Sequence, residues 1–536
     1  MLAGAPWRAR LRWVALMGAC LLPGSGLAQS NGSSLTQADA LKGVLGAERA
    51  RPQLPCHEVR SLGGASFTVI ATESRAGLCR VHAVIAQEIQ FMLELPDRWN
   101  GRLYVLGNGG YAGESVTGDY GRVERDRAHA LGFATVFTNL GHDNEREPGT
   151  SWAKGNFAKK IDYGVRGLHV TTVVAKQILL TYYGHQPRHS YFDGCSTGGG
   201  QALKAAQRFP SDYDGIVGGA PVFDFVELQL YGLNNQRAIA KTPLSRERVA
   251  FLAEQVMELF DAQDGVKDGV IENPLAIDFH PARDLPRASS GRAGFTDAQI
   301  EALEQIYGGL RVGDKQLAPG VPVGAEPSGL TYSDSYFTPA APESGWATRL
   351  IPDSHGYMQQ RANVEEWLKY LAFETDEPDM DIFRFNVQRD VSRLAPMSRI
   401  MDATDPDLAA FAARGGKMII YHGWADTGVN PLTTVHYYER VRQQLGPGVP
   451  GFFRLFMVPG MFHCRGGLGT DRFDALSAVI SWVEANRAPD TLLAARVVGG
   501  KRVRTRPLCP YPAVAHYLGA GNTDEARNFS CQQPAP

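Results

Sequence analysis

Short apolar runs alternate with stretches of helical periodicity between residues 100 and 220 of the chain. Two continuous runs, Leu103–Leu106 and Phe133–Phe137, have the form of strands buried on both faces. Apolar residues at i+3 and i+4 spacing from Val165 to Leu179 predict a long helix, and a second helix is expected between Ser196 and Pro210. Because strand and helix alternate in this way, we expect an α/β fold with a mostly parallel sheet.

Residues 66–95 have a different pattern, which indicates strands ahead of this alternating part. Apolar side chains at positions 89, 91, 93 and 95 alternate with Gln90, Met92 and Glu94. A period of two is typical of a strand with one face in the core and one in solvent. The sequence therefore predicts a half-exposed antiparallel strand here.

The alternation of strand and helix stops between about Val222 and Asp405. Helices are predicted at Arg246–Phe260, at Thr296–Tyr307 with a Thr296/Gln299 capping box, and near Asn363–Leu371. The stretches between them are rich in Pro, Gly, Ser and Ala. Apolar strands then return at 418–421 and 452–458, and Asn430-Pro431 predicts the start of a helix between them. We interpret residues 222–405 as an inserted lid domain.

The N-terminus has the features of a secretion signal. Arg8, Arg10 and Arg12 precede an apolar stretch that ends near Leu22, and small residues before position 28 suit cleavage after Ala28. A membrane anchor is the alternative, but the apolar stretch is shorter than the roughly 20 residues a span needs. Charge is balanced, with 54 Lys and Arg against 56 Asp and Glu, so nothing favours nucleic acid or an anionic membrane as partner. We expect a secreted or periplasmic protein and leave its oligomeric state open.

Six cysteines remain once the predicted signal segment and its Cys20 are removed. An even number in an oxidising compartment suggests disulfides, although the count alone leaves their pairing open. Zinc is a poor alternative because the chain has no close C-x-x-C pair.

Gly194-Cys195-Ser196-Thr197-Gly198 matches G-x-S-x-G, the strand-to-helix turn that exposes a nucleophilic serine above an α/β sheet. A serine nucleophile needs a base within hydrogen-bond reach and an acid that orients the base. Asp426 and His463 each follow a predicted strand, and the chain order Ser, Asp, His is that of α/β-hydrolases. His142 and His422 also follow strands but lie outside the third position of this order, so structural roles are expected for them.

The cysteines next to these residues support the pairing. Cys195 precedes Ser196 and Cys464 follows His463. If the serine and histidine meet, their neighbours come close enough for a Cys195–Cys464 disulfide. We also expect a local Cys56–Cys79 bridge and a Cys509–Cys531 bridge in the C-terminal tail.

Cys195-Ser196, Asp426 and His463-Cys464 together resemble the CS-D-HC motif of the tannase/feruloyl esterase family. Trp99-Asn100-Gly101-Arg102 and the segments 213–217 and 415–423 also resemble family segments. The resemblance implies an α/β-hydrolase core with a lid inserted between nucleophile and acid. It implies Ser196 as nucleophile, His463 as base and Asp426 as orienting acid. The expected division is a signal peptide at 1–28, core at 29–221, lid at 222–405, and core with tail at 406–536.

An oxyanion hole needs two backbone N–H groups aimed at the developing charge. Thr197, the residue after the nucleophile, is expected to supply one. The glycine-rich loop 107–113 is expected to supply the other, and the resemblance favours Gly110, with Gly109 next. An ordinary flexible turn is the alternative for this loop.

Residues 261–270 carry three aspartates separated by glycines. Such a loop offers hard oxygen ligands suited to Ca²⁺, and an acidic surface turn is the alternative. Family members carry a calcium site with this D-x-x-D-G-x-x-D-G spacing. The resemblance implies the carboxylates of Asp261, Asp264 and Asp268 and the carbonyls of Val266 and Val270 as ligands, in a structural role. No cysteine lies between 195 and 464, so we expect calcium to contribute strongly to the order of the lid.

The sequence thus predicts a secreted serine esterase acting on aromatic carboxylic esters of the feruloyl or galloyl type. A hydrolase of a mono(hydroxyethyl) terephthalate-type monoester is the close alternative. A secreted Ca²⁺-dependent binding protein with a degenerate hydrolase core is an alternative of another class. Six aromatic residues of the lid could stack on such a substrate, although for each of them alone a place in the lid core is the favoured interpretation: Tyr332, Tyr336, Phe337, Trp346, Tyr357 and Trp367.

Overall fold

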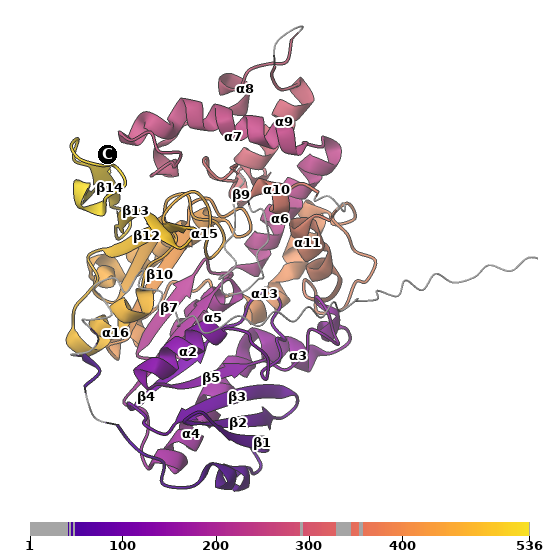
Figure 1. Ribbon diagram of the computed structural model, residues 1–536. Coiled ribbons are helices and arrows are strands. Elements are labelled where there is room, and N and C mark those ends of the chain that lie inside the picture. The colour runs from indigo at the N-terminus through magenta and orange to yellow at the C-terminus, as the bar shows by residue number, and fades with distance from the viewer. Residues whose placement is uncertain are drawn as a thin grey trace, which may run out of the picture.

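The computed structural model describes residue 41 and residues 44–46, 49–289, 293–327, 345–352 and 357–534. The predicted signal peptide, and with it the predicted cleavage after Ala28, lies outside these residues. None of the helices within the described ranges combines the length and apolar content that a membrane span requires. Figure 1 shows a sheet in the lower and central part of the molecule and a group of helices above it.

A nine-stranded mixed sheet forms the centre, with the order β1-β2-β3-β5-β4-β6-β7-β10-β11. Its strands are β1 (Phe67–Arg75), β2 (Leu78–Ile85), β3 (Ile89–Pro96), β4 (Arg102–Leu106), β5 (Ala134–Thr138), β6 (His189–Cys195), β7 (Gly215–Gly219), β10 (Lys417–Gly423) and β11 (Phe453–Val458). The strands from β5 to β11 are parallel to their neighbours, and β1, β2 and β3 join them antiparallel. The carboxyl ends of the parallel strands therefore meet at one edge, where ligands bind in open α/β sheets.

Helices cover both faces of this sheet, as the alternation of strand and helix predicted. Leu103 and Val105 of β4 share one hydrophobic cluster with α4 (Gly167–Tyr183), α5 (Thr197–Arg208) and α15 (Pro431–Leu445). Tyr104 and Leu106 share another with α2 (Arg122–Leu131) and α16 (Ala475–Ala485). Successive side chains of a strand point to opposite faces, so the continuous apolar run of β4 reflects burial on both sides. The α/β-hydrolase fold class is confirmed.

The predicted exposure of β3 is wrong, although its antiparallel pairing is right. β3 lies between β2 and β5 rather than at an edge, and Met92 is buried together with its apolar neighbours. Glu94 is buried as well, because Arg80 and Arg125 form ion pairs with its carboxylate at 3.1 Å each. Alternation of polar and apolar residues therefore did not mark a solvent face here, since paired charges satisfy the buried carboxylate.

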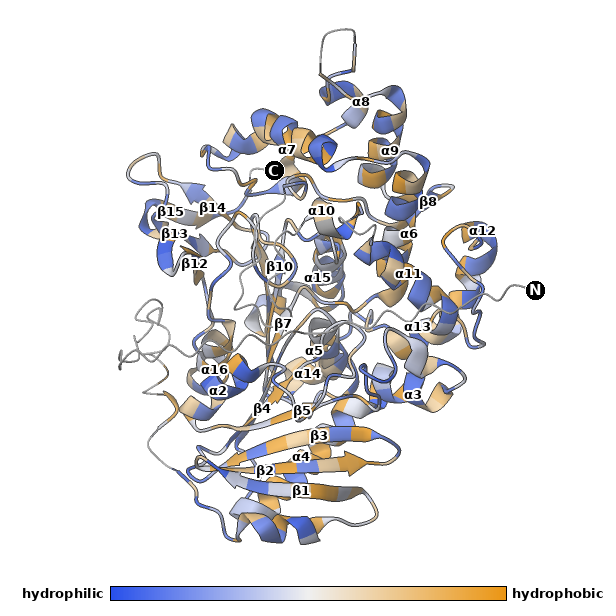
Figure 2. Ribbon diagram, turned by 45° about the vertical axis from the view of Figure 1, so that its right-hand side comes forward, coloured by the Kyte–Doolittle hydropathy of each residue, from blue (hydrophilic) through white to orange (hydrophobic). Residues whose placement is uncertain are grey.

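Most of residues 222–405 lie above the carboxyl edge in Figure 1, and this range contains none of the nine sheet strands. They form α6 (Phe225–Lys241), α7 (Arg246–Phe260), α8 (Pro281–Asp284), α9 (Asp297–Gly308), the hairpin β8 (Leu310–Val312) and β9 (Lys315–Ala318), α10 (Trp346–Arg349), α11 (Gln359–Tyr370), α12 (Val387–Asp390) and α13 (Ala395–Met401). The predicted capping box is present, with Thr296 and Gln299 bonded reciprocally. Helix α11 begins four residues before the predicted Asn363. Lid helices α7 and α9 carry both hydrophobic and hydrophilic residues along their length (Figure 2).

The lid packs on the loops at the carboxyl edge of the sheet through one shared hydrophobic cluster. That cluster joins lid side chains such as Leu303 and Trp367 to Ala112, Leu140 and Phe462, which belong to loops that follow core strands. The loops that carry the candidate site are thus held partly by lid residues.

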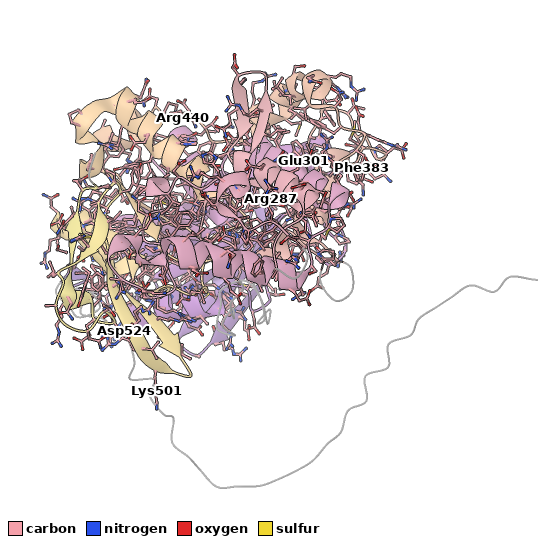
Figure 3. The ribbon with its side chains drawn as sticks, turned by 90° about the horizontal axis from the view of Figure 1, so that it is seen from above. Arg287, Glu301, Phe383, Arg440, Lys501 and Asp524 are labelled. Atoms are coloured by element: carbon pink, nitrogen blue, oxygen red, sulfur yellow. A yellow bond between two sulfur atoms is a disulfide. The ribbon has the colours of Figure 1, made fainter. Side chains whose placement is uncertain are left out.

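The C-terminal tail forms two hairpins beside the lid. Strands β12 (Leu492–Val498) and β13 (Lys501–Leu508) pair with each other, as do β14 (Val514–Tyr517) and β15 (Phe529–Gln532). Seen from above, these yellow strands, with Lys501 and Asp524, lie at one side of the pink lid helices (Figure 3). The predicted Cys509–Cys531 disulfide is present, and so is Cys56–Cys79 near the N-terminus.

Candidate active site

Ser196 sits on a strained turn between β6 and α5. Its backbone has φ 63° and ψ −119°, a region that non-glycine residues occupy only where the surrounding structure enforces it. The glycines that follow let α5 approach β7 closely. A Cβ on Gly199 would lie 2.2 Å from the Gly219 carbonyl oxygen, and one on Gly200 would lie 1.8 Å from that of Val222. The turn is therefore the nucleophile elbow that the G-x-S-x-G pattern predicted.

The structure brings Ser196, His463 and Asp426 together, as predicted from their order in the chain. His463 Nε2 lies 2.8 Å from Ser196 Oγ, and His463 Nδ1 lies 2.7 Å from Asp426 Oδ2. Asp426 and His463 stand on the loops that follow the adjacent parallel strands β10 and β11. An ionised Asp426 accepts a hydrogen bond from Nδ1–H, which leaves Nε2 without a proton and free to take the hydroxyl proton of Ser196.

The surroundings of Asp426 keep its carboxylate ionised. Burial by itself would raise the pKa of Asp426, but the charge and hydrogen bonds of His463 and His422 outweigh burial and hold this pKa well below its usual range. The backbone amides of Gly428 and Val429 also donate to Asp426 Oδ1, at 2.8 and 3.0 Å. A fixed anion at this point holds the imidazole of His463 in one tautomer and orientation.

His422 and His142 both have structural partners. His422 Nε2 faces two acceptors, Asp426 Oδ2 at 3.2 Å and the Val429 carbonyl at 3.1 Å, while Thr434 Oγ1 lies 2.8 Å from Nδ1. Because both groups that face Nε2 are acceptors, Nε2 carries a proton and donates. His142 stacks on Trp152 with ring centroids 4.3 Å apart, and burial lowers the pKa of His142 to about 4. Within the described chain, the one imidazole bonded to Ser196 is that of His463.

The loop after β4 leaves a particular amide available for an oxyanion. The amide of Asn108 donates to Gln201 Oε1 at 3.0 Å and that of Gly109 donates to Glu114 Oε1 at 2.9 Å. Gly110 has a left-handed backbone with φ 49°, and its carbonyl accepts the Thr197 hydroxyl. No hydrogen bond between described residues uses the amide of Gly110 or of Thr197. Of the two glycines predicted for this role, the structure therefore favours Gly110 over Gly109.

Glu114, Asn108 and Gln201 are site residues that the sequence did not reveal. Burial raises the pKa of Glu114, although Asn108 and the Gly109 amide donate to its carboxylate. Its partners are five or six residues away along a loop without regular structure, and Gln201 is 93 residues from Asn108. No periodicity or motif marks such contacts.

The Cys195–Cys464 disulfide is present, as predicted, with a Cα–Cα distance of 6.0 Å. It joins the last residue of β6 to the residue after His463 and closes a loop of 269 residues. Both half-cystines are buried and pack with Ala220 and Tyr421. The bridge therefore ties the nucleophile turn directly to the base loop.

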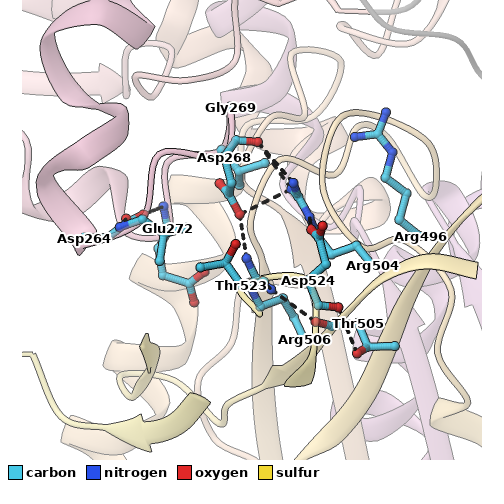
Figure 4. Close-up of polar contacts among 12 residues, drawn as sticks. Asp264, Asp268, Gly269, Glu272, Arg496, Arg504, Thr505, Arg506, Thr523 and Asp524 are labelled. Carbon is cyan, nitrogen blue, oxygen red and sulfur yellow. Dashed lines mark hydrogen bonds and ion pairs between the residues drawn. The ribbon is translucent and has the colours of Figure 1, made fainter. Parts of the chain in front are cut away.

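The predicted calcium loop follows α7, and its acidic side chains already have partners. Asp261 accepts the amides of Asp268, Gly269 and Val270, and Asp264 accepts those of Val266 and Glu272. Asp268 forms ion pairs with Arg506 at 2.6 Å and Arg504 at 3.2 Å, both from β13 (Figure 4).

The donor chemistry of this loop suits calcium, but the arrangement fits less well. Asp264, Val266, Asp268 and Val270, four of the five residues expected to supply ligands, line one cavity. Asp261 is turned to the backbone amides instead, and no group of three or more acidic, His or Cys side chains in the described part of the chain is arranged to hold a metal. In this structure two arginines supply the positive charge that faces Asp268.

The lid places one cation next to the catalytic acid. A Cβ on Gly428 would lie 3.3 Å from both Arg349 Cζ and Asp426 Oδ1, so the guanidinium packs beside the loop of the acid. Burial lowers the pKa of Arg349 while the charge of Asp426 opposes that change. Of the six lid aromatics, Trp346 and Trp367 belong to the buried lid core, Tyr357 is exposed, and Tyr332, Tyr336 and Phe337 lie outside the described residues.

The chain resembles known esterases and hydrolases over most of its length. Residues 73–532 match the family model described as "Tannase and feruloyl esterase". The mono(2-hydroxyethyl) terephthalate hydrolase of Piscinibacter sakaiensis is 33% identical over 87% of each chain. A probable feruloyl esterase B-2 of Aspergillus fumigatus is 29% identical over 87% of this chain and 88% of its own. The crystal structure of an esterase from Aspergillus oryzae superimposes with a TM-score of 0.76 at 25% identity, covering 89% of this chain and 99% of that one.

Proposed function

The chain belongs to the tannase and feruloyl esterase family, and from this premise we propose that Ser196, His463 and Asp426 hydrolyse esters of aromatic carboxylic acids. Membership makes the protein a carboxylic ester hydrolase. This sets aside the binding protein with a degenerate hydrolase core. The observation that carries the assignment of residues is the continuous hydrogen-bond relay of 2.8 and 2.7 Å from Ser196 through His463 to Asp426.

The relay supports an acyl-enzyme mechanism. Ser196 Oγ attacks the ester carbonyl carbon while its proton passes to His463 Nε2. The tetrahedral intermediate collapses, the C–O bond to the alcohol breaks, and His463 returns the proton to the leaving oxygen. A water molecule then attacks the acyl carbon with His463 as base, which releases the acid and restores the serine hydroxyl. Asp426 stays ionised and stabilises the imidazolium formed in each half-reaction.

The oxyanion is bound, in this proposal, by the amides of Gly110 and Thr197. Thr197 opens α5, so its amide also benefits from the positive end of the helix dipole. The hydroxyl of Thr197 donates to the Gly110 carbonyl, which links the two donors to each other. Such preorganised donors act on charge that develops only in the transition state, and that is where they accelerate the reaction.

Feruloyl- or galloyl-type phenolic esters are the first substrate class that we propose, because the family includes feruloyl esterases. A terephthalate-type monoester is the second candidate, and Arg349 favours it. A half-buried guanidinium beside the catalytic acid is well placed to pair with a carboxylate on the acyl group. Methyl ferulate, methyl gallate and the terephthalate monoester compared at equal concentration distinguish these classes. A preference for the monoester that disappears in Arg349→Met would favour the second.

We also propose that the lid binds calcium and that the protein is secreted. The D-x-x-D-G spacing and the cavity shared by Asp264, Val266, Asp268 and Val270 support the first. Calcium bound there would supply charge to the lid loop in a structural role, with no part in the proton transfers. Three disulfides support an oxidising compartment for the mature protein.

The decisive experiment for the proposed function is Ser196→Ala. We expect loss of p-nitrophenyl ester hydrolysis and of fluorophosphonate labelling, with an unchanged circular dichroism spectrum. Turnover that persists in this variant would show that another residue is the nucleophile.

A further inference from the structure

The oxyanion loop is built almost entirely from residues that cannot hold their own conformation. Its sequence Gly107-Asn108-Gly109-Gly110 contains three glycines, which have the largest backbone freedom of any residue. An oxyanion hole works only if its donors are already in place when charge develops. Something outside the loop must therefore fix its peptide planes.

Two side chains from different segments of the chain do this. Gln201, on α5, accepts the Asn108 amide at 3.0 Å and donates from Nε2 to Asn108 Oδ1 at 3.0 Å. Glu114 accepts the Gly109 amide at 2.9 Å on Oε1 and the Asn108 side-chain amide at 2.9 Å on Oε2. Gln201 thus makes two bonds to Asn108, and Glu114 makes one bond to Asn108 and one to Gly109.

The remaining groups of Asn108 complete the clamp. Its carbonyl accepts the Gly198 amide at 2.7 Å, and its Nδ2 donates a second bond to the Thr138 carbonyl at 2.8 Å. Asn108 is fully buried and all of its polar atoms are bonded. The peptide planes before Gly110 are consequently fixed to the helix of the nucleophile and to β5.

We propose that Glu114 and Gln201 are positioning residues of the oxyanion hole: they hold Asn108 and Gly109 so that the Gly110 amide points at the developing charge. Both oxygens of Glu114 act as acceptors, so an isosteric amide cannot replace the carboxylate. A glutamine at 114 would turn its NH₂ group toward one of the two N–H donors. The inference rests on the proposed function, since it concerns the same reaction.

The test is Glu114→Gln, measured on an aromatic ester and with an aryl boronic acid that forms a tetrahedral adduct on the serine. We expect kcat to fall about tenfold or more while KM stays within about twofold. Removing an oxyanion donor outright lowers kcat by a factor of about 10²–10³, and a displaced donor should lower it less. The affinity for the boronic acid should fall by a similar factor. A loss of stability alone would change neither kcat nor the affinity for the boronic acid at temperatures well below the melting point, because the variant would still be folded there.

Glu326→Gln is the matched control. Glu326 is another buried carboxylate, and it accepts the amide of Gly324 and the hydroxyl of Tyr307 inside the lid. The Glu326→Gln variant should lower the melting temperature about as much as Glu114→Gln does, while its kcat and KM stay those of wild type. If Glu114→Gln does not fold, Gln201→Leu removes the clamp from the other side and should show the same split.

The outcomes separate this inference from the function it builds on. The positioning role would be overturned if a folded Glu114→Gln variant kept the kcat and the boronic acid affinity of wild type. Where Glu114→Gln fails to fold, the same result in Gln201→Leu would overturn it. Either result would leave Ser196 as the nucleophile. A wild-type protein that hydrolyses no aromatic ester would overturn the proposed function first.

Discussion

Removal of the Cys195–Cys464 disulfide should cost more stability than removal of either other bridge. In the chain-entropy model, stabilisation grows with the logarithm of the loop that is closed. The loop of 269 residues gives about 5.5 kcal/mol at 25 °C, against about 3.5 kcal/mol for the 23 residues between Cys56 and Cys79. The double variant Cys195→Ala/Cys464→Ala should therefore lose about 2 kcal/mol more than Cys56→Ala/Cys79→Ala.

Urea unfolding of both double variants and of wild type under non-reducing conditions, in which the remaining bridges stay intact, measures this difference. The Cys56/Cys79 variant is the matched control, because it also removes two sulfur atoms. It touches β2 and the segment before β1, away from the site. Activity adds a second readout: without the bridge the His463 loop is no longer tied to the Ser196 turn, so kcat should fall in the first variant and not in the control. Equal losses of stability in the two variants would refute the chain-entropy reasoning for this fold.

Four further predictions follow from the site and from the predicted calcium loop. Asp426→Asn should lower kcat by about 10⁴-fold in ester hydrolysis, because it favours the wrong tautomer of His463, and a loss under tenfold would contradict the orienting role. The depressed pKa of Asp426 should stabilise the fold fully above the ordinary aspartate pKa of about 4, and this contribution should fade as pH falls below that value; melting curves of wild type and Asp426→Asn that stay parallel from pH 6 to 3 would contradict it. EDTA should lower the melting temperature of wild type, and the change should be smaller in Asp264→Asn; identical melting curves with and without EDTA would contradict the calcium proposal. If the arginines compete with calcium for Asp268, Arg506→Met should bind calcium more tightly than wild type in calorimetry.

The parts of this site that the sequence predicted are those with a local signature or a fixed order. The elbow around Ser196 can be recognised in the sequence because only glycine fits where α5 meets β7. Asp426 and His463 follow from chain order and from their places after apolar strands. The Cys195–Cys464 bridge follows from adjacency to two residues that were already suspected.

What could not be predicted depends on contacts between distant segments. Glu94 looks like a solvent-facing residue until Arg80 and Arg125 are seen beside it. The clamp of Glu114 and Gln201 on Asn108 joins a loop to a helix 93 residues away. The ion pairs of Asp268 come from a tail more than 230 residues downstream. Each is decided by tertiary packing, which neither periodicity nor propensity records.

The hydrophobic cluster shared between lid side chains and Phe462, Ala112 and Leu140 has a practical consequence for anyone who wishes to exchange substrate preference between relatives. A lid transferred alone from one relative to another would lack the core-loop side chains against which it packs in its own protein. The donor's residues at those three positions would have to be transferred as well, and these positions lie on loops at the catalytic edge of the sheet. Selectivity and turnover are therefore expected to change together in such chimaeras.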